Sequence, residues 1–325
     1  MLTTELDPGA RRTIATVAWL YHNGGLRQSE IAERLHISQS RVSRLLDQAA
    51  KLGVVRTEVV LPKVERSILE QELQSAYNLS EVHVHDLGDT GDEAQLVLEL
   101  GQMLALHLQN APLTARVIGF TSWSRALGET VRHLQPLRHS DVKFVVEMVG
   151  DLGPPTLQHR AAENTQQLAT LAGAAPMFLR VPGVLPSSEI KQAVLENNSH
   201  ARATLNKLDE LDFALTGIGA VGIAPPLQAG DNFFTTKQIA QARKQGAVGE
   251  LNLRYIAKDG EPLNLDIEDL VIGATLDQLR RARRRLGVAG GPSKYLAIRA
   301  ALVGGWLTML VTDATTAQWL LAHRD

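Results

Sequence analysis

A short run of polar side chains in residues 39–44 has the chemistry to bind nucleic acid. Amide, hydroxyl and guanidinium groups form the hydrogen bonds that base edges and phosphates offer in a DNA groove. Within and just after this run, Val42, Leu45 and Leu46 recur at helical spacing, so one helix would bury these three and expose the polar set. We predict that this set enters the major groove: Gln39, Ser40, Arg41, Ser43 and Arg44. Arg44 is either a base reader or a phosphate clamp.

The residues before this helix indicate how it would be held. Residues 28–35 form a second short amphipathic segment, with Ile31 and Leu35 on its apolar face. The pattern breaks at His36, and Ser38 stands where the N-cap of the next helix belongs. Two short helices joined by a tight turn, the second polar and arginine-bearing, are typical of a helix-turn-helix. A plain helical hairpin is the alternative.

Flanking residues would complete a small winged domain. Asp7 and Pro8 are typical of a helix start, and the Asn-Gly-Gly at residues 23–25 would end that helix. The alternating β-branched residues in 54–60 predict a strand, which would be the wing. Residues 64–77 form an amphipathic segment, which is either a linker helix or the first helix of a second domain.

Charge and composition separate a head from a body. Residues 1–57 carry eight Lys/Arg and five Asp/Glu, a net charge of +3, whereas the whole chain of 325 residues is at −2. A basic head on an acidic body suits DNA binding by the head alone, so we predict a DNA-binding domain at 1–60 and a second domain at 61–325. The absence of Cys excludes disulfides, a thiol nucleophile and Cys-based zinc sites. Without a membrane-length apolar run or a signal-peptide core, we expect a cytoplasmic protein with no membrane partner.

Beyond residue 80 the chain alternates strand-like and helix-like stretches. The apolar runs are residues 82–84, 117–120, 144–146, 177–179, 213–215, 287–289 and 307–311. The helical stretches are residues 93–109, 161–171, 188–208 and 292–302. This alternation predicts an α/β fold, a Rossmann-like parallel sheet covered by helices on both faces. The basic run at 280–285 predicts a solvated helix end, with a second nucleic-acid contact as the alternative.

Loops after two of these strands carry groups suited to a small ligand. The loop after residues 117–120 combines hydroxyls, an indole and a guanidinium, which would suit a phosphate beside a helix start: Ser122, Trp123, Ser124 and Arg125. An ordinary capped helix start is the alternative. Residues 217–222 match G-x-G-x-x-G, but Pro225 and Pro226 follow where a dinucleotide site needs a helix. Gly217 and Gly219 therefore predict close backbone approach to a ligand, or a bare turn.

Two further segments add polar groups. Glu250, Asn252 and Arg254 would lie on one face of an extended strand, where they would bind sugar hydroxyls or form a solvated edge. Lys294 stands at a predicted helix start after Gly290-Gly291-Pro292. A lysine there opposes the helix dipole, which favours an anion between the two.

Several of these segments together resemble the SorC-type sugar-binding transcriptional regulators of bacteria. The resemblance covers nearly the whole chain and rests on IAERLHISQSRVSRLL, GFTSWSRAL, LDFALTGIGA, GAVGELNLRYIAKDGEPL and the tail LGVAGGPSKYLAIRAALVGGWLTMLVTDATTAQWLL. It implies an effector domain similar to sugar-phosphate isomerases, a homodimer or homotetramer, and a phosphorylated sugar or polyol as effector. By the same resemblance, residues 122–125 would hold the phosphate, and Glu250 and Lys294 would face the sugar. Ser124 stands where Gly is more usual in the family.

We therefore predict a regulator, most simply a repressor, that binds double-stranded operator DNA of a sugar or polyol catabolic operon. We predict no catalytic residue, no metal ligand and no cofactor. The rival hypothesis is an isomerase-like enzyme with a DNA-binding head, in which Glu250 and Lys294 do acid–base work. A structural DNA-binding protein without an effector is a third possibility, but it leaves the acidic α/β body without a purpose.

Overall fold

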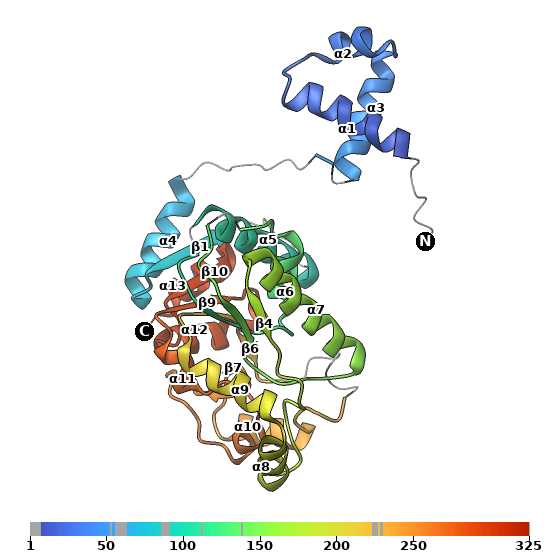
Figure 1. Cartoon of the computed structure of the whole chain (residues 1–325). Helices are drawn as coiled ribbons and strands as arrows, with labels where there is room; N and C mark the ends of the chain where they lie inside the picture. The colour runs from blue at the N-terminus through green and yellow to red at the C-terminus, as the bar shows by residue number, and fades with distance from the viewer. Residues whose placement is uncertain are drawn as a thin grey trace. The chain divides into compact units, whose positions relative to one another are not determined.

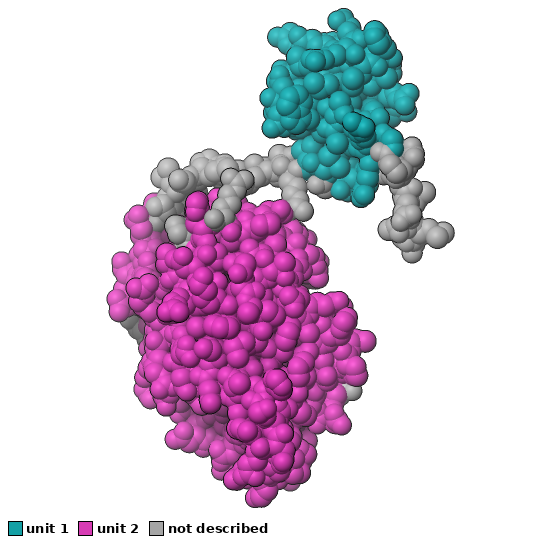
Figure 2. All heavy atoms as spheres, viewed as in Figure 1, with its two compact units in different colours: residues 1–62 teal, residues 63–325 magenta. Residues whose placement is uncertain are grey.

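The computed structural model describes residues 8–52, 54–55, 64–85, 92–111, 113–137, 139–222, 227 and 230–324. The chain divides into two compact units, residues 1–62 and 63–325, which Figure 2 shows in separate colours. The predicted boundary between residues 60 and 61 lies outside the described residues. Among the described helices, none is long and apolar enough to cross a membrane.

The first unit packs three helices around a small apolar core. They are α1 (Pro8–His22), α2 (Gln28–Leu35) and α3 (Gln39–Lys51). Val17, Ile31 and Val42, one from each helix, are fully buried. Burying one apolar stripe from each helix is what stabilises so small a unit. The core therefore fixes which face of α3 points outward.

The turn between α2 and α3 has the geometry of the predicted helix-turn-helix. His36 adopts the left-handed conformation, with φ of 54°, and closes α2. Ser38 caps α3, because its hydroxyl accepts a hydrogen bond from the Arg41 amide at 3.3 Å. The helix-turn-helix is thus confirmed. Val54 and Val55 lie in a bend, and the other residues of the predicted wing are outside the described part of the chain.

The second unit is built on a parallel sheet of seven strands. Their order is β1-β10-β9-β5-β2-β3-β4, and every pairing is parallel. The strands are β1 (Glu81–His85), β10 (Met309–Asp313), β9 (Arg284–Val288), β5 (Phe213–Gly217), β2 (Val117–Phe120), β3 (Phe144–Glu147) and β4 (Ala175–Met177). The predicted α/β class is therefore confirmed.

Helices cover both faces of this sheet (Figure 1). One face carries α5 (Glu93–Asn110), α6 (Arg125–His133) and α7 (Pro155–Ala172), which share one apolar cluster with the sheet. The other face carries α4 (Val64–Tyr77), α12 (Tyr295–Val303) and α13 (Ala314–Ala322). The remaining helices are α8 (Ser188–Asn197), α9 (Ser199–Lys207), α10 (Thr236–Lys244) and α11 (Leu276–Arg281). The α4 helix is thus the first helix of the second unit, one of the two predicted possibilities.

A small antiparallel sheet extends from the end of β5. It contains β6 (Gly219–Ala220), β7 (Gly249–Leu251) and β8 (Arg254–Ile256). Asn252 and Leu253 have φ of 52° and 64°, so they form a two-residue hairpin turn. The prediction of one extended strand across residues 250–254 is wrong, because the chain reverses there. Glu250 pairs with Tyr255 while Leu251 pairs with Arg254, which puts Glu250 and Arg254 on opposite faces.

Only the first part of the basic run at 280–285 is a solvated helix end, because Arg280 and Arg281 are exposed in the last turn of α11. The α11 helix ends at Arg281, and Arg284 already begins β9. Arg285 donates hydrogen bonds to the carbonyls of Ala282 and Trp306 at 2.6 and 3.0 Å, respectively. The Arg280 guanidinium lies 3.9 Å from the centre of the Trp306 ring. Arg280 and Arg285 thus stabilise the loop before β10, which gives these two arginines of the run a structural role.

We expect the packing of α4 to be a measurable part of the stability of the second unit. Leu73 is fully buried, whereas Ile68 on the same helix is 52% exposed. Leu73→Ala should lower the free energy of unfolding by about 2–5 kcal/mol, because it leaves a cavity. The control Ile68→Ala should stay within about 0.5 kcal/mol of the wild type. Urea denaturation measures both, and equal effects would contradict the assignment of α4 to this domain.

Candidate functional site

The polar face of α3 is open to solvent, as DNA recognition requires. The side chains of Gln39, Ser40, Arg41 and Arg44 are exposed and that of Ser43 is half-buried. The Arg44 guanidinium donates to the Ser40 carbonyl at 3.3 Å, so it lies along the helix in the unbound protein. Because Ser38 starts the helix, all five residues fall in its first two turns, where recognition helices contact bases. Their role in DNA binding stays a prediction.

The second candidate site lies at the carboxyl edge of the parallel sheet. The strands β2, β5 and β9 are neighbours, so the loops that follow them emerge side by side. The predicted residues 122–125 follow β2, Lys294 follows β9, and Gly217 is the last residue of β5. Glu250 and Asn252 come instead from the antiparallel hairpin. The edge is therefore assembled from four segments that are far apart in sequence.

Hydrogen bonds join three of these segments. The Thr121 hydroxyl after β2 donates to Asn252 Oδ1 at 2.7 Å and lies 3.4 Å from the Thr216 hydroxyl on β5. Ser124 caps α6 by accepting from the Leu127 amide at 3.5 Å. A Cβ on Gly217 would lie 2.9 Å from Ser124 Oγ, so the end of β5 and the loop after β2 approach closely at this point. The loop, the end of β5 and the hairpin turn thus form one contact region.

Glu250 is a buried carboxylate of the region. It is 8% exposed, and the Leu253 amide donates to its Oε2 at 2.6 Å. A Cβ on Gly219 would overlap this carboxylate, which explains the glycine there. Burial raises the pKa of Glu250 to about 7, although the Leu253 amide and the charge of Lys294 act in the opposite direction. Glu250 therefore changes charge near neutral pH.

Lys294 stands at the start of α12 and is half-buried. Burial lowers its pKa, Arg125 lowers it further, and Glu250 and Glu93 raise it. Arg125 itself is exposed and forms an ion pair with Glu93. Two cations thus act on each other where α6 and α12 begin, and helix starts also attract negative charge. Such an arrangement favours an anionic ligand.

Not every predicted residue has a polar side-chain group that is both exposed and unpaired. The Ser122 side chain is 4% exposed, and its carbonyl accepts from the Asn164 side chain at 3.2 Å. The indole nitrogen of Trp123 is buried and has no hydrogen-bond partner among the described residues. Arg254 turns away from Glu250 and donates to the carbonyls of Ala274 and Glu268.

Sequence reasoning missed the residue that holds the Gly290-Gly291 turn. The Asp313 carboxylate accepts from the Gly291 amide at 3.1 Å and from the Thr316 hydroxyl at 2.6 Å. A Cβ on Gly290 would overlap that carboxylate. An Asp directly after an apolar strand, with a Thr three residues later, is a helix-start signal that could have identified it. Asp313 thereby positions the turn that precedes Lys294.

Comparison with known proteins connects this geometry to a family. Residues 63–322 match the model of the Sugar-bind family of sugar-binding domains. The chain belongs to this family. Residues 10–63 match the model of the MarR family, which agrees with the helix-turn-helix.

Relatives of known role align over nearly the whole chain. The transcriptional regulator LsrR of Klebsiella pneumoniae is 32% identical over 314 residues, covering 95% of this chain and 92% of LsrR. The deoxyribonucleoside regulator of Bacillus subtilis is 29% identical, covering 97% of this chain and 99% of that protein. The crystal structure of the full-length sorbitol operon regulator SorC from Klebsiella pneumoniae has a TM-score of 0.79 at 27% identity, covering 98% of this chain and 100% of SorC. The protein is a sugar-sensing transcriptional regulator of the SorC type, and the predicted resemblance is confirmed.

The raised pKa of Glu250 predicts a pH-dependent stability. The folded state keeps the proton up to about pH 7, whereas the unfolded chain releases it near the ordinary value of 4.5. The stabilisation is thus complete below pH 4.5 and is lost as the pH rises through 7. Relative to Glu250→Gln, the wild type should lose about 3 kcal/mol between pH 4.5 and pH 8.

Urea denaturation of both proteins across this range measures the difference. Glu72→Gln, which removes an exposed carboxylate from α4, controls for the change in charge. A constant difference between the wild type and Glu250→Gln at every pH would contradict the assignment of the titrating group.

Proposed function

We propose that the protein represses a sugar or polyol catabolic operon and releases its operator when a phosphorylated sugar or polyol binds. The observation that carries this proposal is the grouping of Lys294, Arg125 and the starts of α6 and α12 beside the buried Glu250. This grouping offers positive charge for a phosphate and a carboxylate for hydroxyls, so it suits a ligand that has both.

In the proposed complex, the phosphate meets the start of α6. The free amides of its first turn and the segment Ser122–Trp123–Ser124–Arg125 would bind the phosphate oxygens. The sugar hydroxyls would bind Glu250, Lys294 and Asn252. The glycines Gly217 and Gly219 leave room for the Ser124 and Glu250 side chains, and so position two of the groups that would meet the ligand. Arg125 would exchange its exposed ion pair with Glu93 for the phosphate, which costs little because the pair is solvated.

Regulation follows if the ligand prefers the state with low DNA affinity. A ligand shifts an equilibrium only by its difference in affinity for the two states. A coupling free energy of about 1–3 kcal/mol between the two sites would change operator affinity about 5–150-fold. Release is the proposed direction because a catabolic operon should be silent until its sugar is present.

A second candidate is an isomerase-like enzyme. Its support is the raised pKa of Glu250 together with the lowered pKa of Lys294, since acid–base catalysts are tuned in this way. The named relatives are transcriptional regulators, which favours the sensor. Ligand binding without turnover of the same sugar phosphate would support the sensor, and turnover would support the enzyme.

The operator is proposed to be read by a homodimer or a homotetramer, because symmetric assemblies read paired half-sites. A single three-helix head contacts few base pairs. On this proposal the wild-type protein selects palindromic duplexes from a random pool. Its particles in light scattering are multiples of the 35.4 kDa chain.

We expect Arg41→Ala and Arg44→Ala each to weaken operator binding. A base-reading arginine should cost about 1–3 kcal/mol on the selected duplex and little on random DNA. A phosphate clamp should weaken both duplexes and reduce the salt dependence by about one ion. Fluorescence anisotropy on both duplexes at several salt concentrations separates these roles. Arg160→Ala, an exposed arginine of the effector domain, is the control, and full operator affinity in both α3 variants would refute this DNA interface.

For the effector, a thermal-shift screen against sugar and polyol phosphates comes first. A ligand at 100 times its dissociation constant should add about 2.7 kcal/mol of stability. Calorimetric titration of the best hit should then show at least about tenfold weaker binding to Lys294→Ala and Glu250→Gln, since each loses a charged hydrogen bond. Lys237→Ala, exposed on α10, is the charge-matched control. Wild-type affinity in both site variants would exclude this site.

A further inference from the structure

The edge strand β1 has a polar face directed at α5. Val82 and Val84 face the apolar cluster on the opposite side of the sheet, so the side chains of Glu81, His83 and His85 face α5. Their side chains are each between 25% and 36% exposed. Polar residues on the helix-covered face of a sheet require polar partners on the helix.

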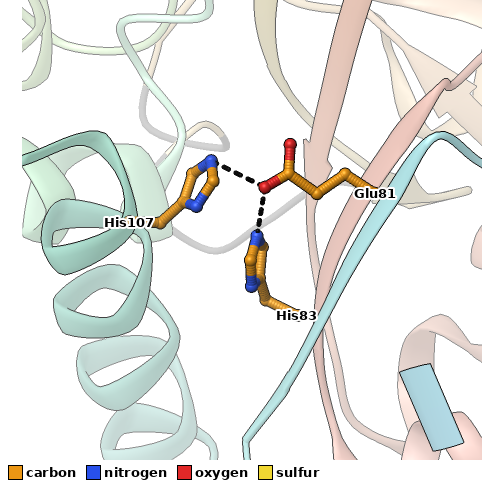
Figure 3. A group of neighbouring side chains, drawn as sticks. All are labelled: Glu81, His83 and His107. Carbon is orange, nitrogen blue, oxygen red and sulfur yellow. Dashed lines mark hydrogen bonds and ion pairs between the residues drawn. The ribbon is translucent and has the colours of Figure 1, made fainter. Parts of the chain in front are cut away.

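Helix α5 supplies those partners along its length. Glu99 lies 3.3 Å from His85, and His107, in the last turn, lies 3.4 Å from Glu81. At this second position three side chains converge, as Figure 3 shows. The Glu81 carboxylate is 2.9 Å from His83 Nε2, and the two imidazole rings have centroids 4.2 Å apart. One ligand atom from each of the three side chains lies within 4.8 Å of the others.

His107 is the least satisfied member of the group. Its side chain is only 10% exposed, and its buried Nε2 has no hydrogen-bond partner among the described residues. Burial and the neighbouring His83 together lower the pKa of His107 to about 4, although the charge of Glu81 acts in the opposite direction. The ring is therefore neutral at neutral pH, and its contact with Glu81 is not an ion pair. A neutral imidazole is the form that coordinates metals.

We propose that Glu81, His83 and His107 form a binding site for a zinc ion, with a fourth position open to water. Two imidazole nitrogens and one carboxylate oxygen are ligands that Zn²⁺ accepts, whereas Mg²⁺ and Ca²⁺ prefer sites made of oxygen. Tetrahedral ligands at the usual zinc distances lie about 3.3 Å apart, close to the spacing of the carboxylate from each ring. The partly exposed Glu81 leaves the fourth position open to solvent.

The surroundings of the site bear on its charge. The site lies at the carboxyl end of α5, where the helix dipole favours a cation. The positive charge of Arg284 acts on the site: it lowers the pKa of both Glu81 and His107, and it would also repel a bound cation. Its guanidinium is held 4.4 Å from the centre of the Phe213 ring. Zinc would therefore compete with Arg284 for the Glu81 charge and would join β1 to the last turn of α5.

This site is independent of the proposed effector site. Glu81 is the first residue of β1, and Lys294 follows the last residue of β9. Because the strands are parallel, the two sites lie at opposite ends of the strands. A failure of either proposal leaves the other intact.

The experiment uses the full chain, without a polyhistidine tag, after treatment with a chelator. Titration with ZnCl₂ by calorimetry should show about one ion bound per chain, with a rise in melting temperature. Addition of Co²⁺ should give the absorption bands of a four-coordinate site. Loss of a residue that only hydrogen-bonds to a metal ligand weakens metal binding roughly 10–100-fold. His83→Gln and His107→Gln each remove a ligand, so each should weaken zinc binding by at least this factor. MgCl₂ should bind far more weakly.

The matched control is His159→Gln, which breaks another His–Glu pair at an exposed position on α7. It should bind zinc as the wild type does. His83→Gln provides the test if His107→Gln fails to fold, because His83 is the more exposed ligand. The proposal is overturned if the wild type binds no zinc, or if His83→Gln binds it with wild-type affinity.

Discussion

The placement of β5 between β2 and β9 is the constraint on which the effector domain depends. Phe213 to Gly217 pair with Arg284 to Val288 on one side, and Ala214 pairs with Gly119 on the other. Because all three strands run in the same direction, their loops must emerge at one edge. Residues separated by more than a hundred positions are thereby brought within hydrogen-bonding distance, as Thr121 and Asn252 are. The chemistry of the edge is thus a consequence of strand order.

The same edge collects charges that are poorly solvated. Burial favours the neutral form of both Glu250 and Lys294, while each charge favours the ionised form of the other. A charged ligand that hydrogen-bonds to both would replace the lost water. Two residues hold the charged groups of this edge in place. Gly219 leaves space for the Glu250 carboxylate, and Asp313 fixes the glycine turn that precedes Lys294. Such support is what a preorganised site requires.

Periodicity and turn chemistry were sufficient to predict the helix-turn-helix and the parallel sheet, because both depend on local patterns. Ser38 and Pro8 marked the helix starts, and the apolar runs marked most of the strands. The hairpin at Asn252 was missed because two non-glycine residues adopt positive φ there, which their side chains disfavour. The same turn separates Glu250 from Arg254. Asn198, whose side chain caps α9, likewise divides a stretch that was predicted as one helix.

The three residues at β1 and α5 show a different limit of sequence reasoning. Glu81 and His83 read as an ordinary alternating strand, and His107 stands alone in an apolar helix, so no ligand spacing marks them. Only the packing of α5 against the edge strand brings the rings to within 4.2 Å of each other. The same helix contributes Glu93, through its pair with Arg125, to the opposite edge of the sheet. Zinc bound at one end of α5 would alter effector affinity at the other end only under one condition. The helix must have two alternative positions, and zinc and the effector must each bind more tightly to one of them. With a single rigid position, the metal would stabilise the fold and leave the sugar response unchanged.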